Sequence, residues 1–138
     1  MNFVIAVDGS EESKEAVNYA VELVPESSRL TVVHAVTPEI YTQDNDVLIE
    51  DMSDAEARAE DVLEDAVETA SDTGKDLSVE YEMLYGDPVE SIVDYAESGE
   101  YDGIFVGHKG ISQKHQDMVG SVTQNLVRKA TLPVTVVR

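Results

Sequence analysis

Glycines in the C-terminal quarter of the chain have the spacing of a phosphate-binding loop. A short apolar run, Ile104–Val106, leads into Gly107 and Gly110, and after nine further residues the stretch Gly120–Thr123 follows. Glycine lets a backbone turn tightly and come close to a ligand. Gly120–Thr123 would then open a helix whose first amides lack partners, and such amides, together with the helix dipole, favour an anion. The spacing therefore predicts a phosphate cradle.

The distribution of charge supports a site of this kind. The chain of 138 residues has 29 acidic and 9 basic side chains, a net charge of −20, yet residues 107–138 contain one acid and five basic residues. Arg128 and Lys129 would suit the end of a helix in any case, because cations there complement the helix dipole. Lys109 and Lys114 have no such explanation, so they favour a bound phosphate.

Composition limits the class of protein. The length fits one domain, residues 1–138, and a hydrophobic fraction of 42% supports a folded core. No apolar run approaches the ~18 residues of a membrane span, and the N-terminus lacks the pattern of a secretory signal. Because the chain also has no cysteine, we expect a cytoplasmic protein. The strong negative charge argues against nucleic acid as a partner.

Hydrophobic periodicity predicts alternating strands and helices. Strands are expected over residues 3–7, 30–36, 77–83, 104–106 and 134–137. Helices are expected up to Pro25, from a Ser53–Glu56 capping box to about Gly74, over 88–98 behind an Asp87 cap, and over 121–130. Residues 37–52 show no such pattern. We interpret them as a long polar connection, a flap whose role the pattern does not reveal.

The order βαβαβαβαβ indicates an α/β fold with a single five-stranded parallel sheet and helices on both faces. Ligands bind such sheets beyond the carboxyl ends of the strands, where the winding reverses. The strand order 3-2-1-4-5 would bring Asp8, after the first strand, and Gly107, after the fourth, to one crevice. We favour that order because it unites these two conspicuous loops.

The glycine spacing resembles the nucleotide-binding signature of the universal stress protein family. It reads Gly107-x2-Gly110-x9-Gly120-Ser121-x-Thr123 in this chain. Further likeness runs through the whole chain, in Ile5–Ser10, Val33–Val36, Gly86–Pro88 and Leu132–Val137. The resemblance implies the 3-2-1-4-5 sheet, and it implies ATP, or else AMP or ADP, as the ligand.

The resemblance also implies a role for the loops after the strands. Asp8 would lie near the ribose or help to hold a divalent metal, Mg or Mn, together with the ATP phosphates; a plain turn or cap aspartate is the alternative. The backbone of Ala35 would meet the edge of the adenine. Gly107 and Gly110 would let the main chain approach the ribose and phosphates, unless they are turn glycines only.

The β- and γ-phosphates would meet the start of the last helix. The residues that would present amides and hydroxyls to them are Gly120, Ser121, Val122 and Thr123, the alternative being an ordinary helix cap. Many family members have arginine after the first glycine, where this chain has His108. The charge on phosphate would therefore come from Lys109, or in part from protonated His108.

The resemblance further implies a homodimer formed through the last strand, Val134–Val137. An apolar edge strand left uncovered would promote association. The alternative is an ordinary strand with the C-terminus at the surface. Nothing in the residue pattern indicates a protein partner of another kind.

These residues favour a binding and regulatory function: an ATP-binding stress-response module with little or no catalysis. The sequence offers no convincing nucleophile or general base beside the phosphate site, and it has no Gly-x4-Gly-Lys-Ser/Thr loop. We assign no catalytic residue. Weak ATP hydrolysis at a metal held by Asp8 is an alternative.

Two further alternatives require residues that this chain lacks. An adenylating enzyme of the ATP-pyrophosphatase type would have a Ser-Gly-Gly-x-Asp-Ser-like loop after the first strand, whereas Asp8–Ser13 lacks the paired glycines. A phosphoacceptor receiver domain would need an aspartate after its third strand, where Asp87 is better explained as a helix cap. Both are therefore disfavoured.

The net charge of −20 predicts a protein adapted to high salt, and we hypothesise a halophilic source. Salt shortens the Debye length to about 3 Å at 1 M and so suppresses repulsion within the folded chain. We expect the midpoint of thermal unfolding, followed by circular dichroism, to rise with KCl concentration. A midpoint that stays constant or falls as KCl is added would contradict the hypothesis.

Overall fold

Five parallel strands form the central sheet of the structure, a computed structural model that describes residues 1–109 and 120–138. The strands are β1 (Asn2–Ala6), β2 (Ser28–Val36), β5 (Leu77–Tyr85), β6 (Gly103–Gly107) and β7 (Val134–Val137). Their order across the sheet is β5-β2-β1-β6-β7. When these five strands are numbered along the chain, the order is 3-2-1-4-5, so the predicted topology is confirmed.

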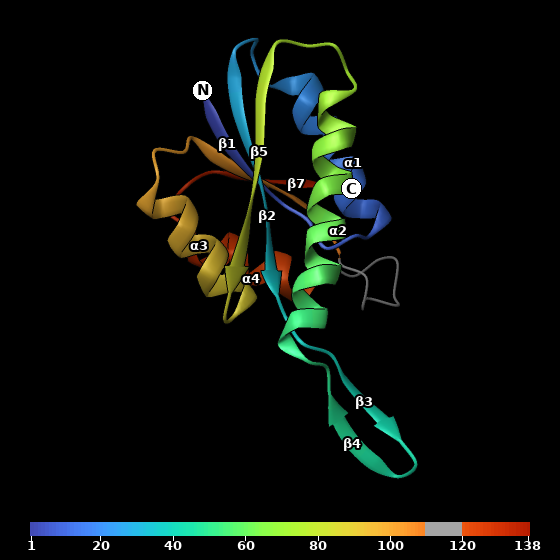
Figure 1. Ribbon diagram of the computed structural model, residues 1–138. Helices are drawn as coiled ribbons and strands as arrows, with labels where there is room; N and C mark the ends of the chain where they lie inside the picture. Colours follow the sequence, from blue (N-terminus) through green and yellow to red (C-terminus); the bar gives the residue numbers. More distant parts are fainter. Residues whose placement is uncertain (110–119) are drawn as a thin grey trace.

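Helices cover both faces of this sheet (Figure 1). Those in the described part of the chain are α1 (Glu11–Leu23), α2 (Met52–Ser71), α3 (Pro88–Ser98) and α4 (Ser121–Lys129). The helices α1 and α2 contribute to one hydrophobic cluster, and α3 and α4 contribute to another on the opposite face. None of these helices is both long enough and apolar enough to cross a membrane.

The core lies on both sides of β1. Val4 and Ile5 are each fully buried, and as neighbours in a strand they point to opposite faces. Val4 belongs to the cluster that contains Leu126, whereas Ile5 belongs to the cluster that contains Leu63. Burial of both faces explains why the first strand is an uninterrupted apolar run rather than an alternating one.

Side chains cap the N-termini of α1 and α3. The Ser10 hydroxyl accepts a hydrogen bond from the Ser13 amide at 3.1 Å. The Asp87 carboxylate accepts one from the Glu90 amide at 3.0 Å, which confirms the predicted cap. Each bond satisfies an amide that has no partner within its helix.

The predicted capping box at the start of the long helix is wrong. The helix α2 begins at Met52 with Asp51 as its N-cap, and no side-chain hydrogen bond caps it among the described residues. Ser53 therefore lies inside the first turn, two residues after the cap position. Helix ends shift easily by this amount because the first turn has few intrahelical bonds to define it.

Residues 37–52, which we interpreted as a patternless connection, contain a β-hairpin. The strands β3 (Ile40–Gln43) and β4 (Asp46–Ile49) pair antiparallel. Asp44 and Asn45 join them with φ angles of 51° and 68°. Two residues with positive φ form the tight turn that matches the twist of a hairpin, and Asp and Asn tolerate it. The hairpin projects away from the sheet (Figure 1).

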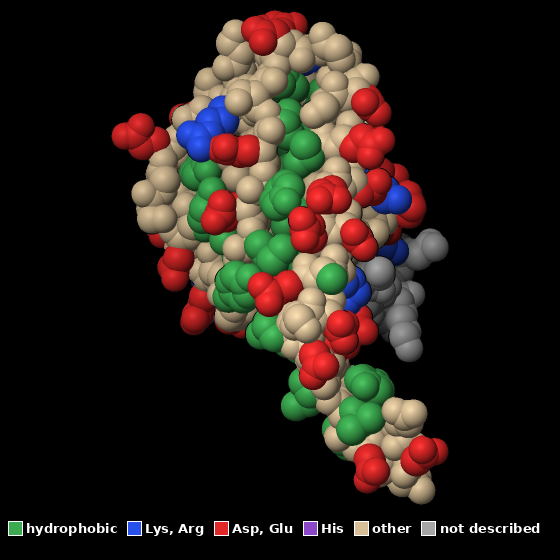
Figure 2. Space-filling view, in the orientation of Figure 1, with side chains coloured by type: hydrophobic (Ala, Val, Ile, Leu, Met, Phe, Trp, Pro, Cys, Tyr) green, Lys and Arg blue, Asp and Glu red, His purple; other side chains and the backbone are tan. Residues whose placement is uncertain are grey.

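One face of the hairpin is apolar and exposed. The register pairs Ile40 with Ile49 and Thr42 with Val47, which places these side chains on a common face. Ile40 and Val47 are each 71% exposed, and Ile49 is 67% exposed. Figure 2 shows hydrophobic side chains on the projecting hairpin, beside a body whose visible face is rich in acidic side chains. An isolated hairpin is only marginally stable in water, so its attachment to the body matters.

Candidate functional site

The carboxyl ends of β1, β2 and β6 surround a cavity of about 360 Å³. This volume lies within the range of small-molecule sites. The predicted site residues that line it are Asp8, Ala35, Gly107, Lys109, Gly120, Ser121, Val122 and Thr123. Gly110 lies outside the described residues, as does the segment that follows it up to residue 119. The structure therefore brings together every predicted site residue that it describes.

One end of the cavity is formed by the start of α4. Its N-cap is Gly120, and no side chain of the described residues caps the helix. The first turn, Ser121–Gln124, contains no acid. Because α1 and α3 have side-chain caps and acids in their first turns, α4 differs from both. Because no described side chain caps its first amides, and because its dipole is positive at this end, α4 makes this end of the cavity favourable for an anion.

Thr123 and Gly107 hold α4 against the end of β6. The buried Thr123 hydroxyl donates to the Gly107 carbonyl at 2.7 Å. This bond leaves the Thr123 amide, rather than its hydroxyl, as the donor of that residue toward an anion. Gly107 also has a packing role, because a Cβ atom there would lie 2.8 Å from the Glu12 carbonyl carbon. A side chain at position 107 would therefore push α1 away from the sheet.

Lys109 lies in the cavity wall and has a partner there. Its Nζ is 3.5 Å from Glu12 Oε1, and the lysine side chain is only 12% exposed. The side chain of His108, by contrast, is buried and is not among the lining residues. Of the two candidates for the positive charge, the structure thus brings Lys109 to the cavity.

The opposite end of the cavity presents the main chain of Ala35. The Val7 amide donates to the Val33 carbonyl at 3.0 Å, as a parallel ladder requires. His34 Nδ1 then contacts the Val7 carbonyl at 2.7 Å, and this is the carbonyl that the ladder would otherwise offer to the Ala35 amide. The N–H and C=O of Ala35 face the same side as those of Val33. They therefore point past the end of β1 toward the cavity.

Asp8 combines a turn role with its place in the lining. Its Oδ1 accepts a hydrogen bond from the Ser10 amide at 2.9 Å, as a turn aspartate does. Among the described residues, no group of three or more His, Cys, Asp or Glu side chains could hold a metal ion. A divalent ion beside Asp8 would therefore need ligand oxygens from elsewhere, and nucleotide phosphates could supply them.

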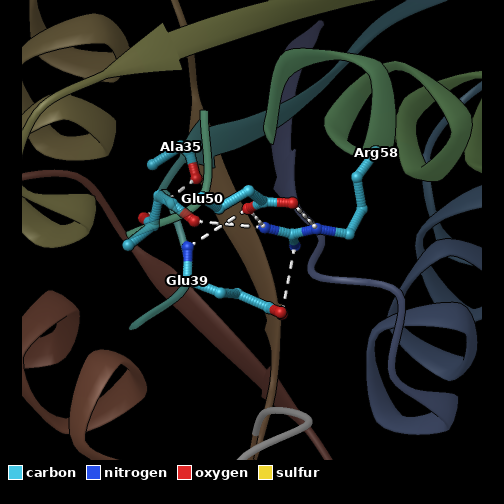
Figure 3. Close-up of polar contacts among 5 residues, drawn as sticks. Ala35, Glu39, Glu50 and Arg58 are labelled. Carbon is cyan, nitrogen blue, oxygen red and sulfur yellow. Dashed lines mark hydrogen bonds and ion pairs between the residues drawn. The ribbon is translucent and has the colours of Figure 1, made fainter. Parts of the chain in front are cut away.

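Sequence reasoning missed a polar cluster at the Ala35 end, which we call the Arg58 clasp: Thr37, Glu39, Glu50 and Arg58. Figure 3 labels the last three of these residues. Arg58 Nη2 donates to Glu50 Oε1 at 2.7 Å and to the Thr37 carbonyl at 3.2 Å. Arg58 Nη1 lies 3.6 Å from Glu39 Oε1. Arg58, Thr37 and Glu39 also line the cavity. The sequence offered one signal, an isolated arginine within a long acidic stretch.

Pairing shifts the titration of both main partners of the clasp. The hydrogen bond from Arg58 lowers the pKa of Glu50, and the same bond raises the pKa of Arg58. Because the pKa of Glu50 is lower in the folded state, this pair makes its full contribution to the free energy of unfolding above the ordinary carboxylate pKa. It is lost as the pH falls through the lowered value.

A model of the universal stress protein family matches residues 1–138. The chain belongs to this family. The universal stress protein YxiE of Bacillus subtilis is 29% identical over 146 residues, which cover 98% of this chain and 97% of that protein.

Solved structures resemble this universal stress protein along its whole length. The protein UspA from Lactobacillus plantarum is 26% identical with a TM-score of 0.74, covering 100% of this chain and 97% of that one. The universal stress protein from Archaeoglobus fulgidus, solved in complex with dAMP, is 25% identical with a TM-score of 0.72, covering 100% and 98%. The α/β fold and the family are therefore established.

The hydrogen bond between the Thr123 hydroxyl and the Gly107 carbonyl leads to a prediction about stability. Replacing Thr123 by Val removes the hydroxyl and leaves a carbonyl without this partner, so we expect a loss of about 1–3 kcal/mol in the free energy of unfolding. Thr123→Ser keeps the hydroxyl and is the matched control, with a smaller loss. Chemical denaturation of both variants measures the difference. Equal losses would show that the hydroxyl contributes little to holding α4.

Proposed function

We propose that this universal stress protein binds an adenine nucleotide, ATP or else ADP or AMP, in the cavity between Ala35 and α4. The observation that supports the proposal best is that one cavity has the start of α4 at one end and the main chain of Ala35 at the other. A helix start that no described side chain caps suits phosphate at one end. A main-chain N–H and C=O suit the polar edge of a base at the other. The dAMP complex of the Archaeoglobus relative supports the same ligand class.

In this proposal each end of the nucleotide has defined partners. The amides of Ser121, Val122 and Thr123 bind phosphate, and Lys109 adds a positive charge that it now shares with Glu12. The ribose lies near Asp8, because that residue sits between the two ends at the close of β1. A magnesium or manganese ion bound to the phosphates could use Asp8 as one further ligand.

We further propose that binding serves regulation in a stress response rather than rapid catalysis. The first turn of α1, beside Asp8, is capped by Ser10 and carries Glu11 and Glu12. This turn repels phosphate, which argues against the adenylating enzymes that bind pyrophosphate there. Weak ATP hydrolysis at a metal near Asp8 is the second candidate, and a phosphate-release assay on the purified protein distinguishes it from binding alone.

The first test is nucleotide binding in high KCl, measured by isothermal titration calorimetry. We expect saturable binding of ATP, and we expect nucleotide released from the purified protein on denaturation to be identified by mass spectrometry. Gly120→Val places a branched side chain at the buried N-cap of α4 and should weaken ATP binding by about tenfold or more. Unchanged affinity in this variant would overturn the assignment of the phosphate end.

A matched pair of lysine variants tests the charge. Lys109→Met removes the cation in the cavity wall, whereas Lys129→Met makes the same change in the exposed last turn of α4. We expect the first to weaken ATP binding several-fold more than the second, because only the first acts at close range. Equal effects would mean that Lys109 contributes only to the general potential of the protein.

We also propose that the protein forms a homodimer through β7. This strand is an edge of the sheet, and its residues Val134–Val136 are only half-buried in the single chain. Such an edge is a template for pairing with another strand. Sedimentation at high salt should give a dimer, and Val136→Lys should shift it toward a monomer. A wild-type protein that sediments as a monomer would contradict this proposal and leave nucleotide binding untouched.

A further inference from the structure

The Arg58 clasp connects the hairpin to the cavity. Its residues come from three places: the link after β2, the two ends of the hairpin, and the second turn of α2. Arg58 Nε also lies 3.5 Å from Glu50 Oε2, so the guanidinium contacts both oxygens of this carboxylate. Two-point contact of this kind fixes orientation as well as distance. Figure 3 shows the guanidinium between Glu50 and Glu39.

Glu50 is held in place by more than the arginine. Its Oε1 accepts a hydrogen bond from the Glu39 amide at 3.1 Å, and its own amide donates to the Glu39 carbonyl at 2.8 Å. The Glu50 side chain is only 18% exposed. These contacts close the base of the hairpin, where the chain leaves the body and where it returns. The Arg58 side chain is 40% exposed, so water still screens part of this ion pair, and its main effect is to fix the position of Glu50.

The clasp also reaches the main chain at the end of β2. Arg58 Nη2 binds the Thr37 carbonyl, and the Thr37 hydroxyl donates to the Ala35 carbonyl at 3.3 Å. A continuous set of contacts therefore leads from Glu50 through Arg58 and Thr37 to Ala35. Pro38, the next residue, restricts the backbone of Thr37. The pairing of Ala35 with Leu84 holds the β5 side of this residue, and Arg58, through Thr37, holds the chain where it leaves Ala35 beside the cavity.

We infer that Arg58 is a positioning residue that sets selectivity for adenine over bases with a carbonyl in place of the amino group. The inference rests on the proposed function. The Ala35 carbonyl can accept a hydrogen bond from an amino group, and the Ala35 N–H can donate one to a ring nitrogen. Adenine offers that pair, whereas hypoxanthine has a carbonyl where adenine has its amino group. A fixed Ala35 edge rejects the second arrangement, and a loosened edge tolerates it.

The test compares three ligands in high KCl: ATP, inosine triphosphate, and inorganic tripolyphosphate, which lacks a base. We expect the wild-type protein to prefer ATP over inosine triphosphate. Arg58→Gln should reduce this preference by about tenfold, the scale of one lost hydrogen bond. Its affinity for tripolyphosphate should stay within about twofold of wild type, because the phosphate end is untouched. Arg128→Gln makes the same change in the exposed last turn of α4 and should leave the preference unchanged.

Two more variants keep the test decisive. Thr37→Val preserves the shape of the side chain but removes the hydroxyl that contacts Ala35, so it should lower the preference even if Arg58→Gln fails to fold. Arg58→Lys keeps the charge but loses the two-point contact, and its preference should be intermediate. Circular dichroism establishes that each variant is folded before binding is measured.

The outcomes separate the inference from the proposed function. If wild-type protein binds tripolyphosphate but no nucleotide more tightly than tripolyphosphate, or binds none of the three ligands, the proposed function fails. If wild-type protein binds ATP and inosine triphosphate with equal affinity, the selectivity inference fails and nucleotide binding stands. If wild-type protein prefers ATP and folded Arg58→Gln and Thr37→Val retain the full preference, the positioning role alone is overturned. An equal loss of ATP and tripolyphosphate binding in Arg58→Gln would also overturn it, because it would show a general collapse of the cavity.

Discussion

The burial of β1 is the constraint on which the rest of the structure depends. This strand pairs with β2 on one side and with β6 on the other, and helices cover both of its faces. A strand enclosed in this way tolerates polar groups only at its ends. The chain leaves it through α1 toward β2, whereas β6 lies on its other side, so the loops after β1 and β6 diverge. Asp8 and Gly107 border the resulting crevice.

An anion site in so acidic a chain requires local control of charge. At the α4 end, the first turn contains no acid, and the Glu12 carboxylate is paired with Lys109. At the opposite end, both Glu39 and Glu50 contact Arg58. The carboxylates nearest the cavity are thus largely bonded to cations or amides. Such pairing acts at short range, so salt weakens it less than it weakens the repulsion from distant acids.

The sheet and the α4 end could be predicted because their signals are local. Apolar runs bounded by glycine and proline define the strands, and the spacing from Gly107 to Thr123 defines the turn and the helix start. The hairpin was not predicted because its strands have only four residues each, too few to show a hydrophobic period. Its turn signal, Asp44 and Asn45, lies among other polar residues. Gly107 also lets α1 pack closely against β6, and this role depends on tertiary packing that the spacing of residues in the sequence does not reveal.

The two ends of the cavity therefore rest on different kinds of interaction. The α4 end uses backbone amides of consecutive residues, so its geometry follows from one short segment and changes little when distant residues change. The Ala35 end depends on Arg58, which meets Thr37 and Glu50 across 21 and 8 positions of sequence. Contacts of that kind require the correct fold of the hairpin and α2 together, and they are lost by a single substitution. The proposed phosphate end therefore rests on the glycine signature alone. The proposed preference for a base has to be argued from contacts such as the Arg58 clasp.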